Sequence, residues 1–306
     1  MILTGPVAVT GAQGRLGRAL VSTLEQHGLD VLAWTRPDYD LDGRGAAKRM
    51  LDRDRPAMII HAAAWTDVDG CARDPAAADR RNGLATAELA EACASAGAGL
   101  LYVSTNEVFD GRREDGLGYS ESDATGPLNP YGASKLAGER SARTALGQRD
   151  GLAGGLWIVR TSWLFGPPGN DFPAKILAAR DRLDPDVPLR VVSDEVASPT
   201  FARDLARGLV ALLERADPGT YHLAGAGQAS RLDWATTVLE ACGRVEPLEP
   251  VPGSTWERAS EPPAWGLLDC SRAGALGIRL PLWQPASIDY ARSLCSAGSP
   301  ALAPSA

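Results

Sequence analysis

Several features on which metal-binding, membrane and secreted proteins depend are missing from this chain of 306 residues. The five cysteines include no C-x-x-C pair, and the three histidines do not stand at zinc-binding spacings. No run of about 18 apolar residues is present, which argues against a membrane-spanning helix. The N-terminus reaches Gly5 without a basic segment and so does not resemble a secretory signal peptide. We therefore expect a cytoplasmic protein whose cysteines stay reduced.

Positive charge is also in short supply. The chain has 31 Lys and Arg against 38 Asp and Glu, which gives a net charge of −7. This balance argues against an extended nucleic-acid-binding surface, but it leaves open a local basic pocket for a phosphorylated small molecule. Hydrophobic residues make up 44% of the chain, as in ordinary globular proteins. The length allows two domains, or one large domain with an insert.

Apolar segments of strand length alternate with segments of helical periodicity through the first two-thirds of the chain. The expected strands are PVAVTGA, DVLAW, AMIIHAAA, GLLYVST and LWIVRTSW, and the expected helices span 15–27, 75–96 and 130–145. Alternation of this kind, with almost continuously apolar strands, predicts a parallel sheet covered by helices on both faces. The expected fold is therefore α/β, a Rossmann-type doubly wound parallel sheet.

The last third of the chain is less regular and is rich in proline and tryptophan. We predict a dinucleotide-binding domain over residues 1–166, to which residues 190–222 return. Residues 167–189 and 223–295 are expected to form a smaller, interleaved substrate-binding subdomain. Residues 296–306 are small and proline-rich, and we expect them to form a flexible tail.

The segment TGAQGRLG places Gly11, Gly14 and Gly17 between the first strand and the first helix. Glycines permit a tight turn and let the backbone approach a pyrophosphate at the helix N-terminus. A turn that uses glycine only for packing would look the same in isolation, but the position after the first strand favours a dinucleotide. The expected cofactor contacts are Gly11, Gln13, Gly14, Arg15, Leu16, Gly17, Arg36, Asp42, Ala62, Ala63, Ala64, Ser104, Tyr131 and Lys135.

The residues after the second strand bear on the choice of cofactor. An acidic side chain there binds a free ribose 2′-hydroxyl, whereas an arginine suits a 2′-phosphate. Arg36 stands at about this place, which favours NADPH. NADH stays possible, and a solvated surface arginine is the alternative. Asp42 is expected either to contact the adenine edge or to form a turn.

The segment NPYGASK carries Tyr131 and Lys135. Asn129 suits a helix N-cap and Pro130 a first helical position, so a helix should begin here. A spacing of four then puts the phenol and the ammonium on one face of that helix. A nearby ammonium stabilises phenolate and would lower the pKa of Tyr131 from about 10. The pair alone is common on helices, but Thr105 and the glycine turn together favour proton-transfer chemistry.

Six motifs of the chain resemble the extended short-chain dehydrogenase/reductase superfamily: TGAQGRLG, HAAAWTDVDGCARDP, STNEVFDG, PLNPYGASKLAGE, VRTSWLFG and SPT. Within it, the chain is most similar to dTDP-4-dehydrorhamnose reductases and related 4-keto-6-deoxysugar reductases of natural-product pathways. The resemblance implies that Tyr131 protonates the ketone oxygen while the nicotinamide delivers hydride. Lys135 would hold the nicotinamide ribose, and Thr105 would steady the keto oxygen. The implied substrate is a dTDP-4-keto-6-deoxyhexose, reduced with NADPH by a monomer or homodimer.

The same resemblance suggests where the sugar nucleotide binds. The expected substrate contacts are Thr66, Thr105, Asn106, Glu107, Tyr131 and Trp163. Thr66 with Asp69 also fits a capping box for the next helix, and Trp163 could instead be a core residue. Asn82 matches a structural asparagine of the superfamily, with a helix-surface amide as the alternative.

Thr105-Asn106-Glu107 differs from the Thr-Asp-Glu of related 4,6-dehydratases, in which the aspartate is the acid. A carboxamide cannot deliver a proton, so we expect reduction rather than dehydration or epimerisation. Glu107 is then expected to order its loop or meet solvent. Two alternatives stay open: a reductase of another activated or small carbonyl substrate, and a non-catalytic NADP-binding regulatory subunit.

Two further positions depart from this family. Its C-terminal Arg-Pro-x-Asn-Ser-x-Leu-Asp motif corresponds here to PPAWGLLD, with Pro262 for arginine and Trp265 for asparagine. The reaction centre is therefore better supported than the identity of the substrate. Some relatives bind magnesium through an acidic residue of the first helix, where this chain has Ala19. We predict no metal.

Overall fold

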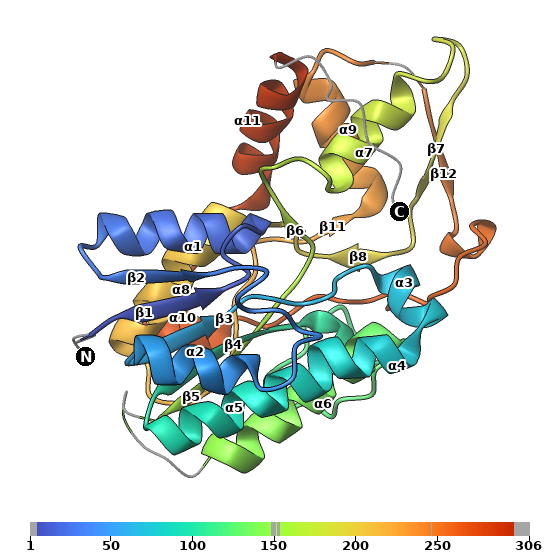
Figure 1. The fold of residues 1–306 in the computed structure, drawn as a ribbon. Helices are drawn as coiled ribbons and strands as arrows, with labels where there is room; N and C mark the ends of the chain where they lie inside the picture. The colour runs from blue at the N-terminus through green and yellow to red at the C-terminus, as the bar shows by residue number, and fades with distance from the viewer. Residues whose placement is uncertain (1–4, 148–150, 152–153, 246, 297–306) are drawn as a thin grey trace.

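A six-stranded parallel sheet forms the centre of the computed structural model, which describes residues 5–147, 151, 154–245 and 247–296 (Figure 1). Across the sheet the strands are β10 (Gly219–His222), β5 (Leu156–Thr161), β4 (Gly99–Thr105), β3 (Met58–His61), β1 (Val7–Thr10) and β2 (Val31–Trp34). Every pair of neighbours in this sheet is parallel. The inner strands are apolar on both faces and buried, which confirms the predicted doubly wound α/β fold.

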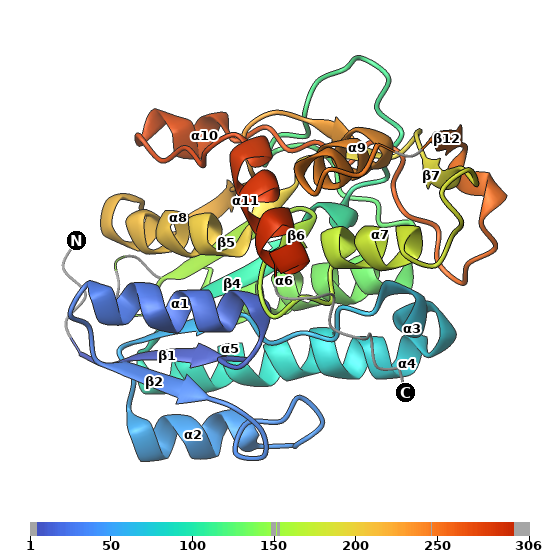
Figure 2. The same ribbon diagram turned by 90° about the horizontal axis from the view of Figure 1, so that it is seen from above.

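Helices cover both faces of this sheet (Figure 2). One face carries α1 (Arg15–Gln26) and α8 (Ala202–Arg215), and the other carries α2 (Ala46–Asp54), α5 (Ala85–Ala96) and α6 (Pro130–Leu146). Successive strand residues point to opposite faces, so Val7 and Val9 join the core under α1 and α8, whereas Ala8 joins the other core.

The strand order reverses beside β1, because β2 lies on one side of it and β3 on the other. In open α/β sheets, ligands bind beyond the carboxyl ends of the strands at such a reversal. The glycine turn follows β1, and the segment 62–64 follows β3, so both lie at this place. The topology therefore puts the predicted cofactor turn where a dinucleotide is expected.

The helix predicted over 75–96 is interrupted by a wider turn. It consists of α4 (Pro75–Ala78), the π-helix η1 (Asp79–Leu84) and α5. Asn82 in η1 is buried; its amide accepts a hydrogen bond from Trp65 N (2.8 Å) and donates to Trp65 O and Ser134 Oγ. The structural role expected for Asn82 is thus confirmed, and the helix-surface alternative is wrong.

A smaller group of elements packs above the carboxyl ends of the strands. It contains α7 (Phe172–Arg180), α9 (Arg231–Ala241), α11 (Trp283–Ser296) and the strand pairs β7–β12 (Leu189–Val192, Leu248–Val251), β8–β11 (Val196–Ala197, Ala229–Ser230) and β6–β9 (Leu164–Phe165, Thr200–Phe201). The remaining short helices are α3 (Val68–Arg73), η2 (Asn106–Val108), η3 (Gly253–Thr255) and α10 (Ser271–Ala275). Strand β7, which we expected within the segment returning to the sheet, pairs with β12 instead. Of the predicted tail, residues 297–306 lie outside the described residues.

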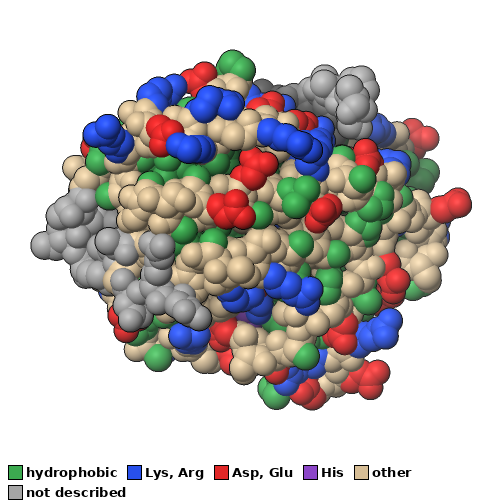
Figure 3. Space-filling model, turned by 60° about the horizontal axis from the view of Figure 1, so that its bottom comes forward, with side chains coloured by type: hydrophobic (Ala, Val, Ile, Leu, Met, Phe, Trp, Pro, Cys, Tyr) green, Lys and Arg blue, Asp and Glu red, His purple; other side chains and the backbone are tan. Residues whose placement is uncertain are grey.

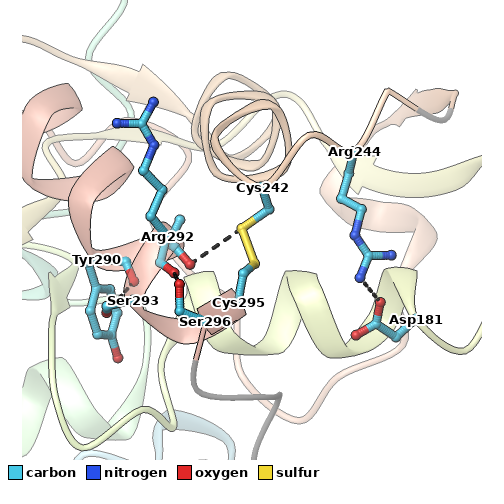
Figure 4. The surroundings of a disulfide bond; sticks show 9 residues. Asp181, Cys242, Arg244, Tyr290, Arg292, Ser293, Cys295 and Ser296 are labelled. Carbon is cyan, nitrogen blue, oxygen red and sulfur yellow. Dashed lines mark hydrogen bonds and ion pairs between the residues drawn. A yellow bond between two sulfur atoms is a disulfide. The ribbon is translucent and has the colours of Figure 1, made fainter.

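Cys242 and Cys295 form a disulfide, so the expectation that all cysteines are reduced is wrong (Figure 4). Cys242 ends α9 and Cys295 lies in the last turn of α11. These two helices pack together and bring the Cα atoms to 6.3 Å across a separation of 53 residues. Because the two cysteines are 53 residues apart, no short motif in the sequence marks them as a pair.

The surface and the helices agree with the composition. Figure 3 shows acidic and basic side chains interspersed over the face it draws, so the net charge is not gathered into one patch there. Among the described residues, no helix is long and apolar enough to cross a membrane. Nor does any group of three or more His, Cys, Asp or Glu in this part of the chain form a metal-binding cluster.

Candidate active site

Two clefts meet at the carboxyl edge of the sheet and form one groove, because both are lined by Gly11, Gly14, Ala62 and Ala64. The cofactor-turn cleft has a volume of about 570 Å³, and the reaction cleft has a volume of about 400 Å³. The cofactor-turn cleft is lined by the predicted contacts Gln13, Arg36, Asp42 and Ala63. The reaction cleft is lined by Arg15, Leu16, Gly17, Thr66, Ser104, Thr105, Asn106, Glu107, Tyr131, Lys135 and Trp163. The structure therefore brings every predicted cofactor and substrate contact to one groove.

The glycine turn has the geometry that a close-lying phosphate needs. Gly11 has a φ of 64°, and a Cβ on Gly17 would collide with the Gly11 carbonyl oxygen. Gly14 is the N-cap of α1, and it offers no side chain to bond the first N–H groups of that helix. These donors, together with the helix dipole, suit an anionic group.

The cofactor-turn cleft carries a local excess of positive charge. Three arginines line it, Arg18, Arg36 and Arg81, against two acids, Asp40 and Asp42. Asp42 forms ion pairs with Arg80 and with Arg81 (2.9 Å), and the hydrogen bonds of Arg81 chiefly lower the pKa of Asp42 to about 2. Asp42 is thus an ion-paired carboxylate at the wall of the cleft. Arg36, which lines the same cleft, is exposed.

Helix α6 begins where the sequence predicts it. The Asn129 side chain accepts the Gly132 N–H (2.8 Å), which makes it the N-cap, and Pro130 is the first helical residue. A Cβ on Gly132 would collide with the Glu107 carbonyl oxygen, so the helix start packs directly on the loop after β4. This packing brings Tyr131 next to Thr105, whose side chain hydrogen-bonds it.

The pKa of Tyr131 is raised, chiefly by burial and further by the charge of Glu107, while the Thr105 hydrogen bond opposes the shift. We had predicted that Lys135 would lower this pKa, and that prediction is wrong for the described geometry. Lys135 Nζ donates to the carbonyl oxygen of Val103 (2.8 Å) and is turned away to lie over the Tyr102 ring. Tyr131 therefore stays a neutral phenol near neutral pH, the form that can donate a proton.

Lys135 is itself buried, and burial lowers its pKa to about 7, against the opposing charge of Glu139. Glu139 forms a bidentate ion pair with buried Arg160 (2.9 and 2.8 Å). The Ser104 hydroxyl also donates to Glu139 (2.6 Å). Ser104 lines the reaction cleft. Its hydroxyl proton is donated to Glu139, however, and is not available to a cofactor.

The side chains of Asn106 and Glu107 form hydrogen bonds with residues of other segments. Asn106 Nδ2 donates to the Gly266 carbonyl oxygen (3.1 Å), and its Oδ1 accepts from the Thr105 hydroxyl (3.4 Å). Glu107 accepts from Asn129 Nδ2 (2.7 Å), and burial raises the pKa of Glu107. The carboxamide at 106 is therefore a hydrogen-bond donor that an aspartate could not replace, and Glu107 orders the loop as expected.

Residues 258–266, which we call the strap, cross this end of the groove without regular structure. The strap is fastened at Ser260, whose N–H and hydroxyl both donate to Asp69 (3.0 and 2.5 Å). The predicted Thr66–Asp69 capping box is therefore not formed. Asp67 caps α3 instead and accepts the N–H three residues on, which leaves Thr66 exposed at the reaction cleft.

Nine residues of the reaction cleft were not predicted as contacts, among them Thr161, Phe172, Arg231 and Trp234. The Thr161 hydroxyl is buried and has no hydrogen-bond partner among the described residues, as expected of a group that meets a ligand. Thr161 belongs to the RTSW motif, so the sequence held a signal for it. Nothing in the sequence marked Arg231, which stacks on Trp163, a residue with a φ of 39°.

Another cavity, of about 710 Å³, is larger than either cleft and lies elsewhere, between the 113–123 loop and the segments 223–228 and 267–280. None of the predicted cofactor or catalytic residues lines it. We place the chemistry in the smaller reaction cleft, because the half-buried tyrosine and the buried lysine and threonine lie there.

Comparison with known proteins agrees with this geometry. The family model described as RmlD substrate binding domain matches residues 6–295. The chain belongs to this family. It is 36% identical over 305 residues to a dTDP-4-dehydrorhamnose reductase of Streptomyces griseus, covering 97% of this chain and 96% of that protein. It is 37% identical over 249 residues to a dTDP-4-keto-6-deoxy-D-glucose reductase of Streptomyces niveus, covering 78% and 81%.

A solved structure shows the same architecture. The crystal structure of dTDP-4-dehydrorhamnose reductase from Bacillus anthracis in complex with NADP superimposes with a TM-score of 0.85 at 28% identity. The match covers 95% of this chain and 99% of that one. The whole fold described above, including the smaller upper part, is therefore shared with this family.

Proposed function

We propose that this protein is an NADPH-dependent reductase of the 4-keto group of a dTDP-4-keto-6-deoxyhexose. The observation that carries the proposal is the grouping of Thr105, Tyr131 and Lys135 in a cleft continuous with the glycine turn. The relatives named above, and the NADP in the Bacillus anthracis structure, support the substrate class and the cofactor.

The groove fits a dinucleotide by its own chemistry. Gly11, Gly14 and Gly17 with the open N-terminus of α1 suit the pyrophosphate, and the unpartnered Thr161 hydroxyl suits a polar group at the other end. When bound, NADPH would supply the hydride. Arg36 would contact the 2′-phosphate and Lys135 the nicotinamide ribose.

The residues at the reaction end divide the remaining work. Tyr131, kept neutral by burial, donates its proton to the ketone oxygen as that oxygen gains charge. The Thr105 hydroxyl, adjacent to the phenol, orients the same oxygen. Lys135, whose Nζ donates to the Val103 carbonyl oxygen, lines the same cleft and is left with the ribose contact rather than a part in the proton transfer.

A dehydratase is disfavoured by the contacts of Asn106. Its amide is committed to Gly266 O and to the Thr105 hydroxyl, and it carries no acidic proton. We further propose that residues 1–166 with 190–222 bind the cofactor and that residues 167–189 and 223–295 bind the sugar nucleotide. Phe172, Arg231 and Trp234 in the reaction cleft support this division. The cytoplasmic location and the natural-product pathway remain predictions from the sequence.

The deciding experiment follows NADPH oxidation by the purified protein with a dTDP-4-keto-6-deoxyhexose as substrate. We expect oxidation that depends on the sugar nucleotide. Binding of NADPH without any such turnover would overturn the reductase and favour the regulatory subunit.

Cofactor choice can be tested at Arg36. The variant Arg36→Ala removes the cation assigned to the 2′-phosphate, so we expect the ratio of kcat/KM for NADPH over NADH to fall by about 10-fold. Arg44→Ala, also exposed but outside the groove lining, is the matched control. An unchanged ratio in Arg36→Ala would remove the assignment.

A further inference from the structure

Arg231 is a cation of the reaction cleft with no task in the reaction derived above. Three basic residues line that cleft: Arg15, Lys135 and Arg231. Arg15 is bonded to the 166–170 loop through Gly166 O (2.9 Å), and Lys135 is bonded to the β4 backbone. Arg231 is the first residue of α9, in the upper part of the molecule.

The guanidinium of Arg231 is held by aromatic rings and by a carboxylate. It lies 3.6 Å from the centroid of the Trp163 ring and 5.1 Å from that of Phe172. Its Nε faces Glu195 Oε2 at 3.3 Å. Stacking covers a flat face of the guanidinium and leaves its edge for planar, paired hydrogen bonds. Within the described residues, only this Nε of the Arg231 side chain forms a hydrogen bond with protein, and the two terminal nitrogens form none.

Arg231 lies among both cations and carboxylates. Glu195 is 5% exposed and is paired with Arg258 of the strap as well as with Arg231, so two guanidinium groups share one carboxylate. Of the other acids that line the cleft, Asp171 caps α7 and pairs with Arg15, whereas Glu107, which accepts from the neutral Asn129 amide, also faces Arg231. An anion that enters here would meet an oriented, partly desolvated cation.

We propose that Arg231, oriented by Glu195 and Trp163, binds the diphosphate of the nucleotide-activated sugar. The inference rests on the proposed function, because it names the part of that substrate which this end of the cleft recognises. Guanidinium groups bind phosphate oxygens in a fork of two parallel hydrogen bonds.

The test measures binding rather than turnover, with the NADP-saturated protein and thymidine diphosphate or thymidine as probes in calorimetry. In Arg231→Gln we expect the Kd of thymidine diphosphate to rise about 10- to 100-fold, with the Kd of thymidine unchanged. Arg231→Lys keeps the positive charge but loses the paired hydrogen bonds, so its Kd for thymidine diphosphate should lie between those of the original protein and Arg231→Gln. Arg190→Gln is the matched control, since Arg190 also lies by a tryptophan, Trp256, and a glutamate, Glu249, outside the cleft.

Two results would overturn the proposal. The first is an unchanged Kd for thymidine diphosphate in Arg231→Gln. The second is an equal loss for thymidine and its diphosphate, which would mean that Arg231 only supports the shape of the cleft. Failure of the reductase itself would look different: the keto sugar would not be turned over, while the phosphate-dependent loss in Arg231→Gln would remain.

Discussion

The floor of the reaction cleft and the strap above it are held in place by different means. The floor consists of β4 and α6, which rest on regular hydrogen bonding and on the buried pair of Glu139 and Arg160. The strap has no helix or multi-residue strand, and it is fastened by backbone hydrogen bonds to Val196 and Gly111 and by side chains of other loops. Asn106 and Asn129 each donate to a strap carbonyl oxygen, and Asp69 accepts from Ser260.

The catalytic side chains and the strap are therefore fixed by different contacts. The catalytic side chains stand on elements that the core fixes, so their geometry does not depend on the strap sequence. The strap is held largely through its backbone, at the carbonyl oxygens of Glu261 and Gly266. Side chains there can therefore change without disturbing the floor.

The largest effect should come from the floor, at the proton donor. Tyr131→Phe removes the phenolic proton and keeps the ring, so we expect kcat to fall by about 10²- to 10⁴-fold. The Kd for NADPH, measured by fluorescence titration, should stay within a few-fold of the original. Full turnover by this variant would refute the role given to Tyr131.

A second effect should fall on the stability of the floor. Glu139→Gln leaves Arg160 buried without its carboxylate, and we expect a loss of about 3–5 kcal/mol in the free energy of unfolding, measured in urea at neutral pH. Glu249→Gln, which removes an exposed pair with Arg190, should cost less than about 1 kcal/mol.

The pH dependence of that loss follows from the pKa of Glu139. Burial alone would raise this pKa, but the hydrogen bonds and charge of Arg160 outweigh burial and lower it. A carboxyl with a lowered pKa stabilises the fold above its unfolded value of about 4.3 and ceases to do so as the pH falls through the folded value. The difference between the original protein and Glu139→Gln should therefore shrink in acid; a difference that grew would contradict the ion-pair account.

The smallest effect should come from the strap contact at Asn106. In Asn106→Asp, a carboxylate faces the Gly266 carbonyl oxygen, so the donor is lost and we expect kcat/KM to fall by about 10- to 100-fold above neutral pH. The repulsion raises the pKa of the new carboxyl. Part of the activity should return as the pH falls through that raised value, since the protonated acid can again donate. Asn106→Ala should show the loss without this recovery, and identical pH profiles would disprove the donor role.

The predictable parts of the fold and site are those encoded by neighbouring residues. Asn129 and Pro130 start a helix by local rules, and the position of Tyr131 and Lys135 on it follows from spacing. The glycine turn was evident because only glycine allows the φ of Gly11 and the closeness at Gly17. These motifs therefore predict a groove at the carboxyl edge of the sheet, where the two clefts lie.

The parts that the sequence did not reveal depend on contacts between distant residues. Asp69 looked like a capping residue because its real partner, Ser260, lies 191 positions away. The orientation of Lys135 depends on the Val103 carbonyl oxygen across the α6–β4 contact, and the stack of Arg231 on Trp163 depends on how α9 packs. Spacing arguments reach one or two helical turns, and these interactions lie beyond that range.

The bond between Cys242 and Cys295 closes a covalent ring that contains β12, η3, the strap, α10 and nearly all of α11. In the chain-entropy account, closure of a ring of this size removes about 4 kcal/mol of freedom from the unfolded chain. A break of the polypeptide anywhere inside the ring would leave both pieces attached to one molecule. The strap lies inside this ring. After a single cut of its backbone, both ends would therefore stay attached to the molecule while the disulfide is intact.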